Sequence, residues 1–299
     1  MDLCLSCKAC QSECPSSVNV SKLKGEFMQS YYDQHGIPFR TRLIADFSKQ
    51  MKWASRFSSV YNSLVSKQAV RRVLNNWIGF HPERTMPAVA NQTLWEWFHK
   101  RQKSKEQFST HTGRLYFFCD EFTNYQDVEV GRKAILLIET LGYQVLMVKH
   151  PDSARTYLSK GLIKEAKHLV NEQISIFAKL IDEQSPLVGI EPSAILGFRD
   201  EFLSLVDASM KPAAQKVAKH ALLFEEWFMQ EADKGRIKKD QFTSVQKQIK
   251  IHGHCHQKSI ASMTPTKRAL SFPENYEARL IPSGCCGMAG SFGYEKEHY

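Results

Sequence analysis

The chain has 299 residues, a formal net charge of +9, 42% hydrophobic residues and 24% charged residues, which is the composition of a folded globular protein. This composition excludes a disordered chain, a collagen and a coiled-coil rod, and the N-terminus lacks the basic and apolar regions of a secretion signal. No run of about 18 apolar residues occurs and the basic residues are scattered, so we expect no transmembrane segment and no nucleic-acid partner. The sequence favours a cytoplasmic protein and leaves a position at the membrane periphery open.

The first segment along the chain, residues 1–36, carries a cysteine cluster. Its spacing is Cys4-x2-Cys7-x2-Cys10-x3-Cys14 followed by proline, which is the bacterial ferredoxin spacing for a [4Fe-4S] cluster. Zinc is the alternative, but a zinc ribbon usually presents two separated Cys-x2-Cys pairs. In two-cluster ferredoxins the fourth cysteine ligates the other cluster, so Cys14 either closes a local cluster or serves a second one. We therefore expect iron at these four thiols, with the basic Lys8 nearby favouring the reduced state.

Residues 37–110 show apolar positions at helical spacing, and we expect a helical connector. From residue 111, short apolar strands alternate with helices, which implies βαβ units and a mostly parallel sheet. We expect strands near 115–119, 143–148, 186–190, 248–251 and 278–281, and helices at 128–141, 154–181, after 193 and at 212–229. The order suggests two α/β halves, from 111 to about 205 and from 206 to 299.

A second group of thiols follows the last two expected strands. One loop reads His252-Gly-His254-Cys255-His256, and the other reads Gly-Cys285-Cys286-Gly. Loops that follow strands are where α/β domains assemble sites. Three histidines invite zinc, but alternating residues of an extended segment cannot all point at one ion. A cysteine-rich iron site is the preferred interpretation, with two buried small hydrophobes as the alternative for the vicinal pair. His254 and His256 are candidate proton donors.

Together with Phe122-Thr-Asn-Tyr125, Ser159-Lys-Gly-Leu162 and Gly189-Ile-Glu-Pro-Ser193, these motifs resemble the C-terminal iron-sulfur half of large FAD-linked oxidases of the D-lactate and D-2-hydroxyglutarate dehydrogenase type. The resemblance covers essentially the whole chain. More distantly, the chain is similar to the CCG subunits of glycolate oxidase, anaerobic glycerol-3-phosphate dehydrogenase and heterodisulfide reductase.

This resemblance implies a mixed fold with an α-helical ferredoxin-like N-terminal region (1–36), a helical connector (37–110) and an α/β CCG-type domain of two pseudo-repeated halves (111–299). It also implies an oxidoreductase component that passes electrons from a flavin to an acceptor. The metal ligands would be Cys4, Cys7, Cys10, Cys14, Cys255, Cys285 and Cys286. FAD is expected only on a missing domain or a partner chain, so an FAD-binding oxidase domain or subunit is the expected partner.

The chain departs from the family pattern at several positions. In the first α/β half, residues 149–155 and Ala194 replace segments in which relatives carry cysteine, so we expect Cys119 to be a buried strand residue without a cluster. The second half ends before a further cysteine segment, and an upstream quartet is missing. We therefore expect a fragment of a longer protein.

Two alternatives stay open at this point: an iron-sulfur subunit of a glycolate oxidase or heterodisulfide reductase type complex, and a zinc-binding structural subunit. The sequence assigns no catalytic residue and no cofactor-binding residue besides the metal ligands. It defines neither the substrate nor the electron acceptor.

Overall fold

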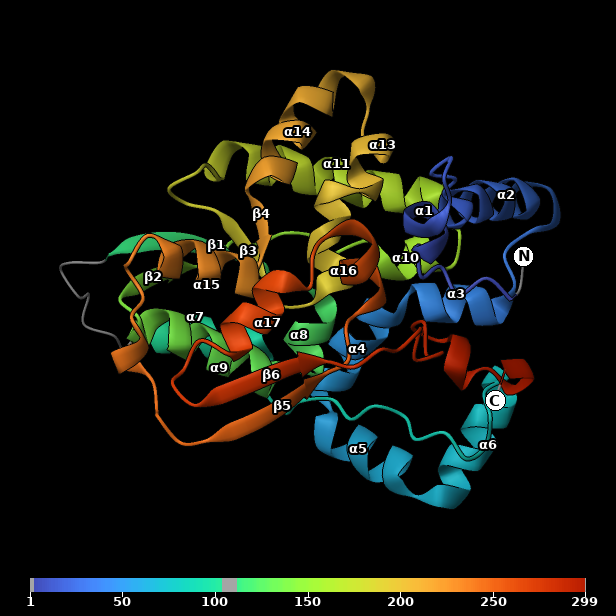
Figure 1. Cartoon of the computed structure of the whole chain (residues 1–299). Coiled ribbons are helices and arrows are strands. Elements are labelled where there is room, and N and C mark those ends of the chain that lie inside the picture. Colours follow the sequence, from blue (N-terminus) through green and yellow to red (C-terminus); the bar gives the residue numbers. More distant parts are fainter. Residues whose placement is uncertain (1–2, 104–111, 299) are drawn as a thin grey trace.

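The protein, represented by a computed structural model that describes residues 3–103 and 112–298, has a mixed α/β fold, as expected (Figure 1). Its first third is built from helices: α1 (Ala9–Glu13), α2 (Val20–His35), α3 (Phe39–Ala45), α4 (Phe47–Arg56), α5 (Ser58–Ser66), α6 (Gln68–Ile78) and α7 (Leu94–Gln102). Gly79, with a φ of 88°, ends α6 in the left-handed conformation that glycine adopts most readily. The expected domain boundary between residues 110 and 111 lies outside the described residues.

Parallel strands organise the rest of the chain. The larger sheet has the order β2-β1-β3-β4, with β1 (Gly113–Phe117), β2 (Tyr143–Leu146), β3 (Leu187–Gly189) and β4 (Ala221–Leu223). A smaller parallel sheet pairs β5 (Lys247–Ile251) with β6 (Tyr276–Leu280). Parallel neighbours require crossover connections, and helices supply them here.

The helices of this part are α8 (Glu121–Tyr125), α9 (Val128–Thr140), α10 (Arg155–Ser159), α11 (Ile163–Leu180), α12 (Pro192–Ile195), α13 (Glu201–Leu205), α14 (Lys211–His220), α15 (Phe224–Asp233), α16 (Cys255–Ile260) and α17 (Thr264–Leu270). Short 3-10 turns are η1 (Leu196–Arg199), η2 (Ala208–Met210), η3 (Lys239–Gln241), η4 (Phe292–Tyr294) and η5 (Lys296–His298).

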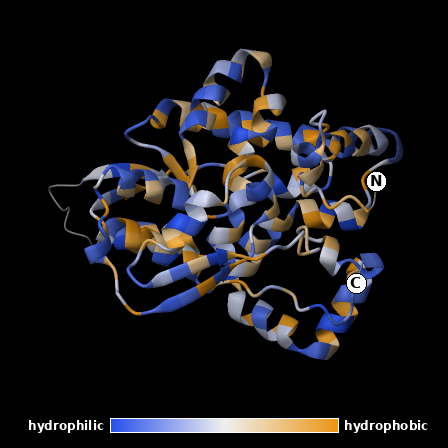
Figure 2. Cartoon of the chain, in the orientation of Figure 1, coloured by the Kyte–Doolittle hydropathy of each residue, from blue (hydrophilic) through white to orange (hydrophobic). Residues whose placement is uncertain are grey.

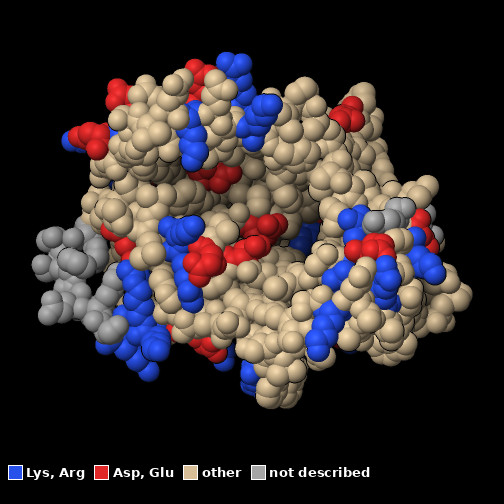
Figure 3. All heavy atoms as spheres, turned by 90° about the horizontal axis from the view of Figure 1, so that it is seen from below, with Lys and Arg blue, Asp and Glu red and all other residues tan. Residues whose placement is uncertain are grey.

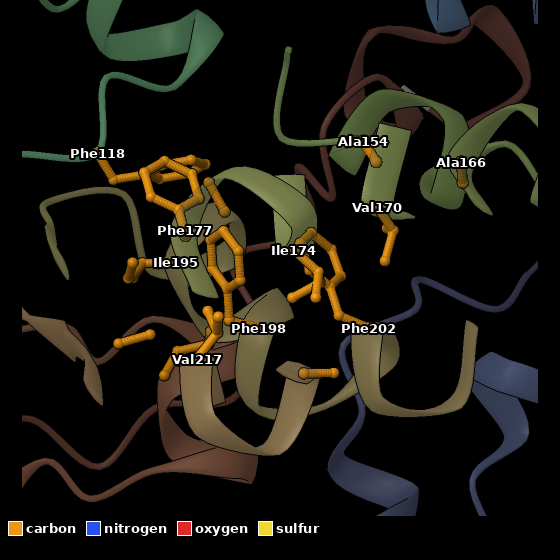
Figure 4. Packing of buried hydrophobic residues seen from close by; sticks show 14 of the residues in the cluster. Phe118, Ala154, Ala166, Val170, Ile174, Phe177, Ile195, Phe198, Phe202 and Val217 are labelled. Atoms are coloured by element: carbon orange, nitrogen blue, oxygen red, sulfur yellow. The ribbon is translucent and has the colours of Figure 1, made fainter. Parts of the chain in front are cut away.

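The larger sheet separates two hydrophobic cores, and its strands are among the most hydrophobic segments of the chain (Figure 2). Adjacent strand residues point to opposite faces, so Leu187 belongs to one core and Val188 to the other. In the first core Phe118 packs against Phe177 of α11 and Phe198 of η1, with 5.2 Å between the ring centroids of Phe118 and Phe198 (Figure 4). Burial of both faces explains why the central strand β3 is apolar throughout.

Two helices that the sequence predicts as continuous are each divided in the structure. The helix expected at 154–181 is divided at Gly161, whose φ of 74° is left-handed and whose missing side chain makes room for Met28 of α2. The helix expected at 212–229 is divided by β4, which pairs with β3. A short buried apolar run fits a strand and a buried helix equally well by its periodicity, which is why the sequence did not distinguish them.

The helical part packs against the α/β part through α2 and α11. Gly25 of α2 lies against Ile163 of α11, where an added Cβ would approach the Ile163 side chain to 3.0 Å. Near the other end of α2, Lys164 Nζ forms an ion pair with Asp33 Oδ1 at 2.8 Å. Within residues 3–103 and 112–298, no helix combines the length and the apolar character that a membrane crossing requires.

Candidate metal centres

The N-terminal cysteines lie on a loop that leads into the short helix α1. The four thiols are partly buried, and Cys10 lies inside α1. Ser6 and Lys8, between the first three cysteines, have φ angles of 52° and 66°. Residues other than glycine rarely adopt left-handed backbone angles because their side chains crowd the backbone. Contacts elsewhere must therefore hold the loop in this shape.

Backbone N–H groups surround the last thiol of the quartet. The N–H groups of Val18, Ser16 and Ser17 donate hydrogen bonds to Cys14 and lower the pKa of its thiol. A lower pKa favours the thiolate, which is the form that ligates metal. The chain beyond Cys14 is therefore shaped to stabilise negative charge on this sulfur.

Lys8 fixes the cysteine loop from inside the protein. Its side chain is 1% exposed, and Nζ lies 2.5 Å from Asp200 Oδ2 and also pairs with Glu201 of α13. Arg155 Nη1 reaches Glu201 Oε1 at 2.8 Å. Burial alone would raise the pKa of Glu201, but Arg155 and Lys8 lower it below its ordinary range. Two carboxylates thus pair with Lys8, and its expected influence on a reduced cluster stays a prediction.

Helix α16 supports the same loop from a second side. His256 Nε2 lies 3.0 Å from the carbonyl oxygen of Ser6, and Ser259 Oγ donates to the carbonyl oxygen of Cys7 at 3.3 Å. Burial, with Arg155 and Lys8 nearby, lowers the pKa of His256 to about 3, so the imidazole is neutral and Nε2 is its donor nitrogen. Cys255 is the first residue of this helix. One short helix therefore carries a thiol of the second cysteine group and holds the first.

The structure brings the second group of cysteines together. Burial and a hydrogen bond with the Cys285 thiol raise the pKa of Cys255 to about 11, and Cys286 contributes in the same direction. The Gly287 N–H donates to Cys285 Sγ at 3.4 Å. Lys258 of α16 donates to the carbonyl oxygens of Ser283 and Gly284, at 2.9 and 3.2 Å, and so ties this loop to the helix that carries Cys255. Cys285 and Cys286 remain exposed.

The three histidines of the second group have separate partners. His252 Nδ1 is 2.9 Å from Ser283 Oγ, and His254 Nδ1 accepts a hydrogen bond from the His256 N–H at 3.2 Å. His254 Nε2 lies 3.9 Å from Glu191 Oε1, and burial lowers the pKa of His254. His254 therefore caps α16, and His252 links its loop to the loop that contains Ser283.

Among the residues that the structure describes, neither group of cysteines has its side chains arranged around a position for a single metal ion. Across the described parts of the chain, no three side chains of Cys, His, Asp or Glu converge on a position for one metal ion. The all-thiol donor set of the quartet and the N–H groups at Cys14 suit a metal group that takes thiolate ligands.

Buried carboxylates follow strand β1 of the larger sheet. Cys119 lies just beyond the end of β1, 3.6 Å from Asn124 Oδ1, and burial raises the pKa of its thiol well above the ordinary value. Burial and nearby Glu191 raise the pKa of Asp120 to about 7. Burial, Asp152 and Asp120 raise the pKa of Glu121 to about 8. Burial thus raises the pKa values of two carboxyl groups at this end of β1 far above their ordinary range, which sequence reasoning missed.

The partners of Lys8 were also missed. Asp200 lies 192 residues from Lys8 in the sequence, and no local pattern distinguishes it or Glu201 from an ordinary surface carboxylate. Only the fold brings these residues together.

No family model and no solved structure matches the chain. Curated proteins do: the chain is 23% identical over 313 residues to a D-2-hydroxyglutarate dehydrogenase of Haemophilus influenzae, and 24% identical over 314 residues to one of Escherichia coli K12. Both matches cover 100% of this chain and 29% of the relative. A subunit of the anaerobic glycerol-3-phosphate dehydrogenase of Escherichia coli K12 is 22% identical, with 95% of this chain and 70% of that protein covered.

These matches confirm the resemblance indicated by the cysteine motifs. The proteins similar to this chain are dehydrogenases, which are oxidoreductases, and the chain spans less than a third of the length of the D-2-hydroxyglutarate dehydrogenases.

Proposed function

We propose that this chain is the iron-sulfur electron-transfer portion of an FAD-linked 2-hydroxy acid dehydrogenase of the D-2-hydroxyglutarate or D-lactate type. It would be an oxidoreductase component acting with a flavin-binding domain or subunit. The observation that carries the proposal is the ferredoxin-type quartet on a loop locked against α16, the helix that begins with Cys255. Similarity to dehydrogenases over the whole chain supports it.

In this proposal Cys4, Cys7, Cys10 and Cys14 hold a [4Fe-4S] cluster, which supplies one-electron transfer when bound. The chain's own residues prepare the site. Backbone N–H groups after Cys14 stabilise the thiolate, and the ion pairs of Lys8 hold the left-handed loop in place. Residues 1–36 would form the cluster segment, 37–110 the connector and 111–299 the cysteine-rich domain.

Cys255, Cys285 and Cys286 form the second proposed site. Three thiols are one fewer than a cubane cluster usually takes, and their exposure leaves a position for an exogenous ligand. The first α/β half, with carboxylates and Cys119, is proposed to be without a cluster. The thiols of both sites suit a reducing cytoplasmic compartment.

A second arrangement is favoured by one comparison. The anaerobic glycerol-3-phosphate dehydrogenase relative is matched over 70% of its length, so a chain similar to this one also occurs in a protein that is named as a subunit. The present chain would then meet its flavin on a separate polypeptide, as in complexes of the glycolate oxidase or heterodisulfide reductase type.

Anaerobic reduction of the purified chain with dithionite tests the proposal. We expect broad absorbance near roughly 400 nm that bleaches on reduction, with an electron paramagnetic resonance signal of a reduced cluster. Cys7→Ser should remove most of this signal, whereas the matched variant Cys119→Ser should retain it. A colourless protein that contains zinc, or a Cys7→Ser variant with an unchanged signal, would overturn the assignment.

A further inference from the structure

The segment from residue 47 to residue 82 has an unusual charge balance. It contains six basic residues and no Asp or Glu, and the basic residues are Lys49, Lys52, Arg56, Lys67, Arg71 and Arg72. Lys49 pairs with Asp46 and Arg72 with Glu83, both just outside the segment. Lys52, Arg56 and Lys67 are exposed, and within the described residues no salt bridge engages them. Helix α4 and the residue before α6 therefore carry positive charge that no salt bridge of the described residues compensates.

The same helices expose large apolar side chains. Trp53 is 65% exposed at the end of α4, and Phe57 is 65% exposed in the turn that follows. On α6, Val73 and Trp77 are 69% and 70% exposed and lie four residues apart, on one face of the helix. A folded protein normally buries large apolar side chains, so their exposure on consecutive helices indicates an interaction surface.

We propose that α4, α5 and α6 form a docking surface for an anionic lipid bilayer. Helices with an apolar face containing tryptophan, basic residues on the flanks and low overall hydrophobicity lie in the membrane interface. Arg56 lies over the Trp53 ring at 5.0 Å, which keeps a cation beside an aromatic group suited to the headgroup region. Lys52, Arg56 and Lys67 are exposed, and their positive charge complements anionic headgroups, which favours a lipid surface over a protein partner.

The arrangement of the helices agrees with this role. α5 and α6 form a hairpin that extends below the body of the molecule, away from the larger sheet (Figure 1). Seen from below, wide uncharged areas lie between Lys and Arg side chains, and Asp and Glu side chains lie beside some of these cations (Figure 3). The peripheral membrane position that the sequence left open thereby acquires a defined surface. The inference does not depend on the metal content of the chain.

Sedimentation with lipid vesicles tests the proposal. The full chain is mixed with vesicles of phosphatidylcholine and phosphatidylglycerol at 3:1, and with vesicles of phosphatidylcholine alone. We expect binding to the anionic vesicles that weakens in 0.5 M salt because screening shortens the reach of surface charge. Neutralising Lys52 and Lys67 together to Gln should weaken binding about 25-fold, at about fivefold for each charge. Trp77→Ser should weaken it about tenfold through lost apolar burial.

The matched control combines Val245→Ser with Arg279→Gln. Val245 is 67% exposed and the Arg279 side chain 81% exposed, and both lie outside α4 to α6. This control should bind like the wild type, and all variants should keep the wild-type circular dichroism spectrum. Failure to bind anionic vesicles, or equal loss in the control, would overturn the proposal. A concentration-dependent dimer that Trp77→Ser abolishes would also overturn it, because a second copy would then be the occupant.

Discussion

The ion pairs of Lys8 make a strong quantitative prediction. Replacing Lys8 with Met keeps the length of the side chain and removes its charge, which leaves two buried carboxylates with one cation fewer. Removing one partner of a buried ion pair typically costs about 3 to 5 kcal/mol. Asp200 retains Lys22 at 3.0 Å and Glu201 retains Arg155 at 2.8 Å, so we expect the lower end, about 3 kcal/mol. For a chain of this size that lowers the melting temperature by roughly 5 °C.

Lys22→Met is the matched control, because it removes the other cation from the same carboxylate. The Lys22 side chain is 35% exposed, against 1% for Lys8, and partly exposed pairs contribute less than about 1 kcal/mol. Denaturant unfolding under reducing, oxygen-free conditions measures both variants. Adding Asp200→Asn to Lys8→Met should recover part of the loss, since it removes a buried carboxylate that is left with only the partly exposed Lys22. Equal costs for the two lysine variants would refute the reasoning.

Three further predictions concern the α/β part. The raised pKa values of Asp120 and Glu121, about 7 and 8, mean that the folded state holds protons the unfolded chain has lost. The contribution of these two carboxyl groups to stability should therefore be full below about pH 4 and fall as pH rises towards 8, by at most about 1.4 kcal/mol per pH unit for each carboxyl. Denaturation at pH 5, 6, 7 and 8 should show a shallower fall for Asp120→Asn, and an unchanged slope would contradict the assignment. Gly131→Ala should cost about 1 to 3 kcal/mol in thermal unfolding, because the new Cβ would lie 2.5 Å from Leu94 Cδ2, and a neutral effect would show that α7 and α9 adjust freely. Cys119→Ser should leave iron content unchanged in metal analysis, and a loss of iron would give the first α/β half a ligand.

The sequence predicted the parts of the fold that depend on local pattern. Alternation of apolar strands with helices indicated a parallel α/β sheet, and β5 and β6 formed near the expected residues. β4 was missed because its short apolar run joins two helical patterns without a turn residue between them. Only pairing with β3 in the folded chain makes it a strand.

The candidate sites also combine features that follow from local sequence with features that depend on the fold. Cysteine spacing identifies the quartet from 11 consecutive residues, and the loop positions of Cys255 and Cys285 follow from the strands before them. Long-range pairing cannot be predicted in this manner. The contacts of Ser6 with His256 and of Lys8 with Asp200 span 250 and 192 residues, and they place the two groups of cysteines around one helix. That proximity is the main addition of the structure to the sequence.

Metal analysis of the chain purified without oxygen tests the central claim most directly. Iron, acid-labile sulfide and zinc are measured per chain for the wild type, Cys7→Ser and Cys119→Ser. A cluster at the quartet predicts about four iron and four sulfide in the wild type and in Cys119→Ser, with both nearly lost in Cys7→Ser. About eight iron in the wild type would mean that the second site is filled as well. Zinc near one per chain without sulfide would contradict the account.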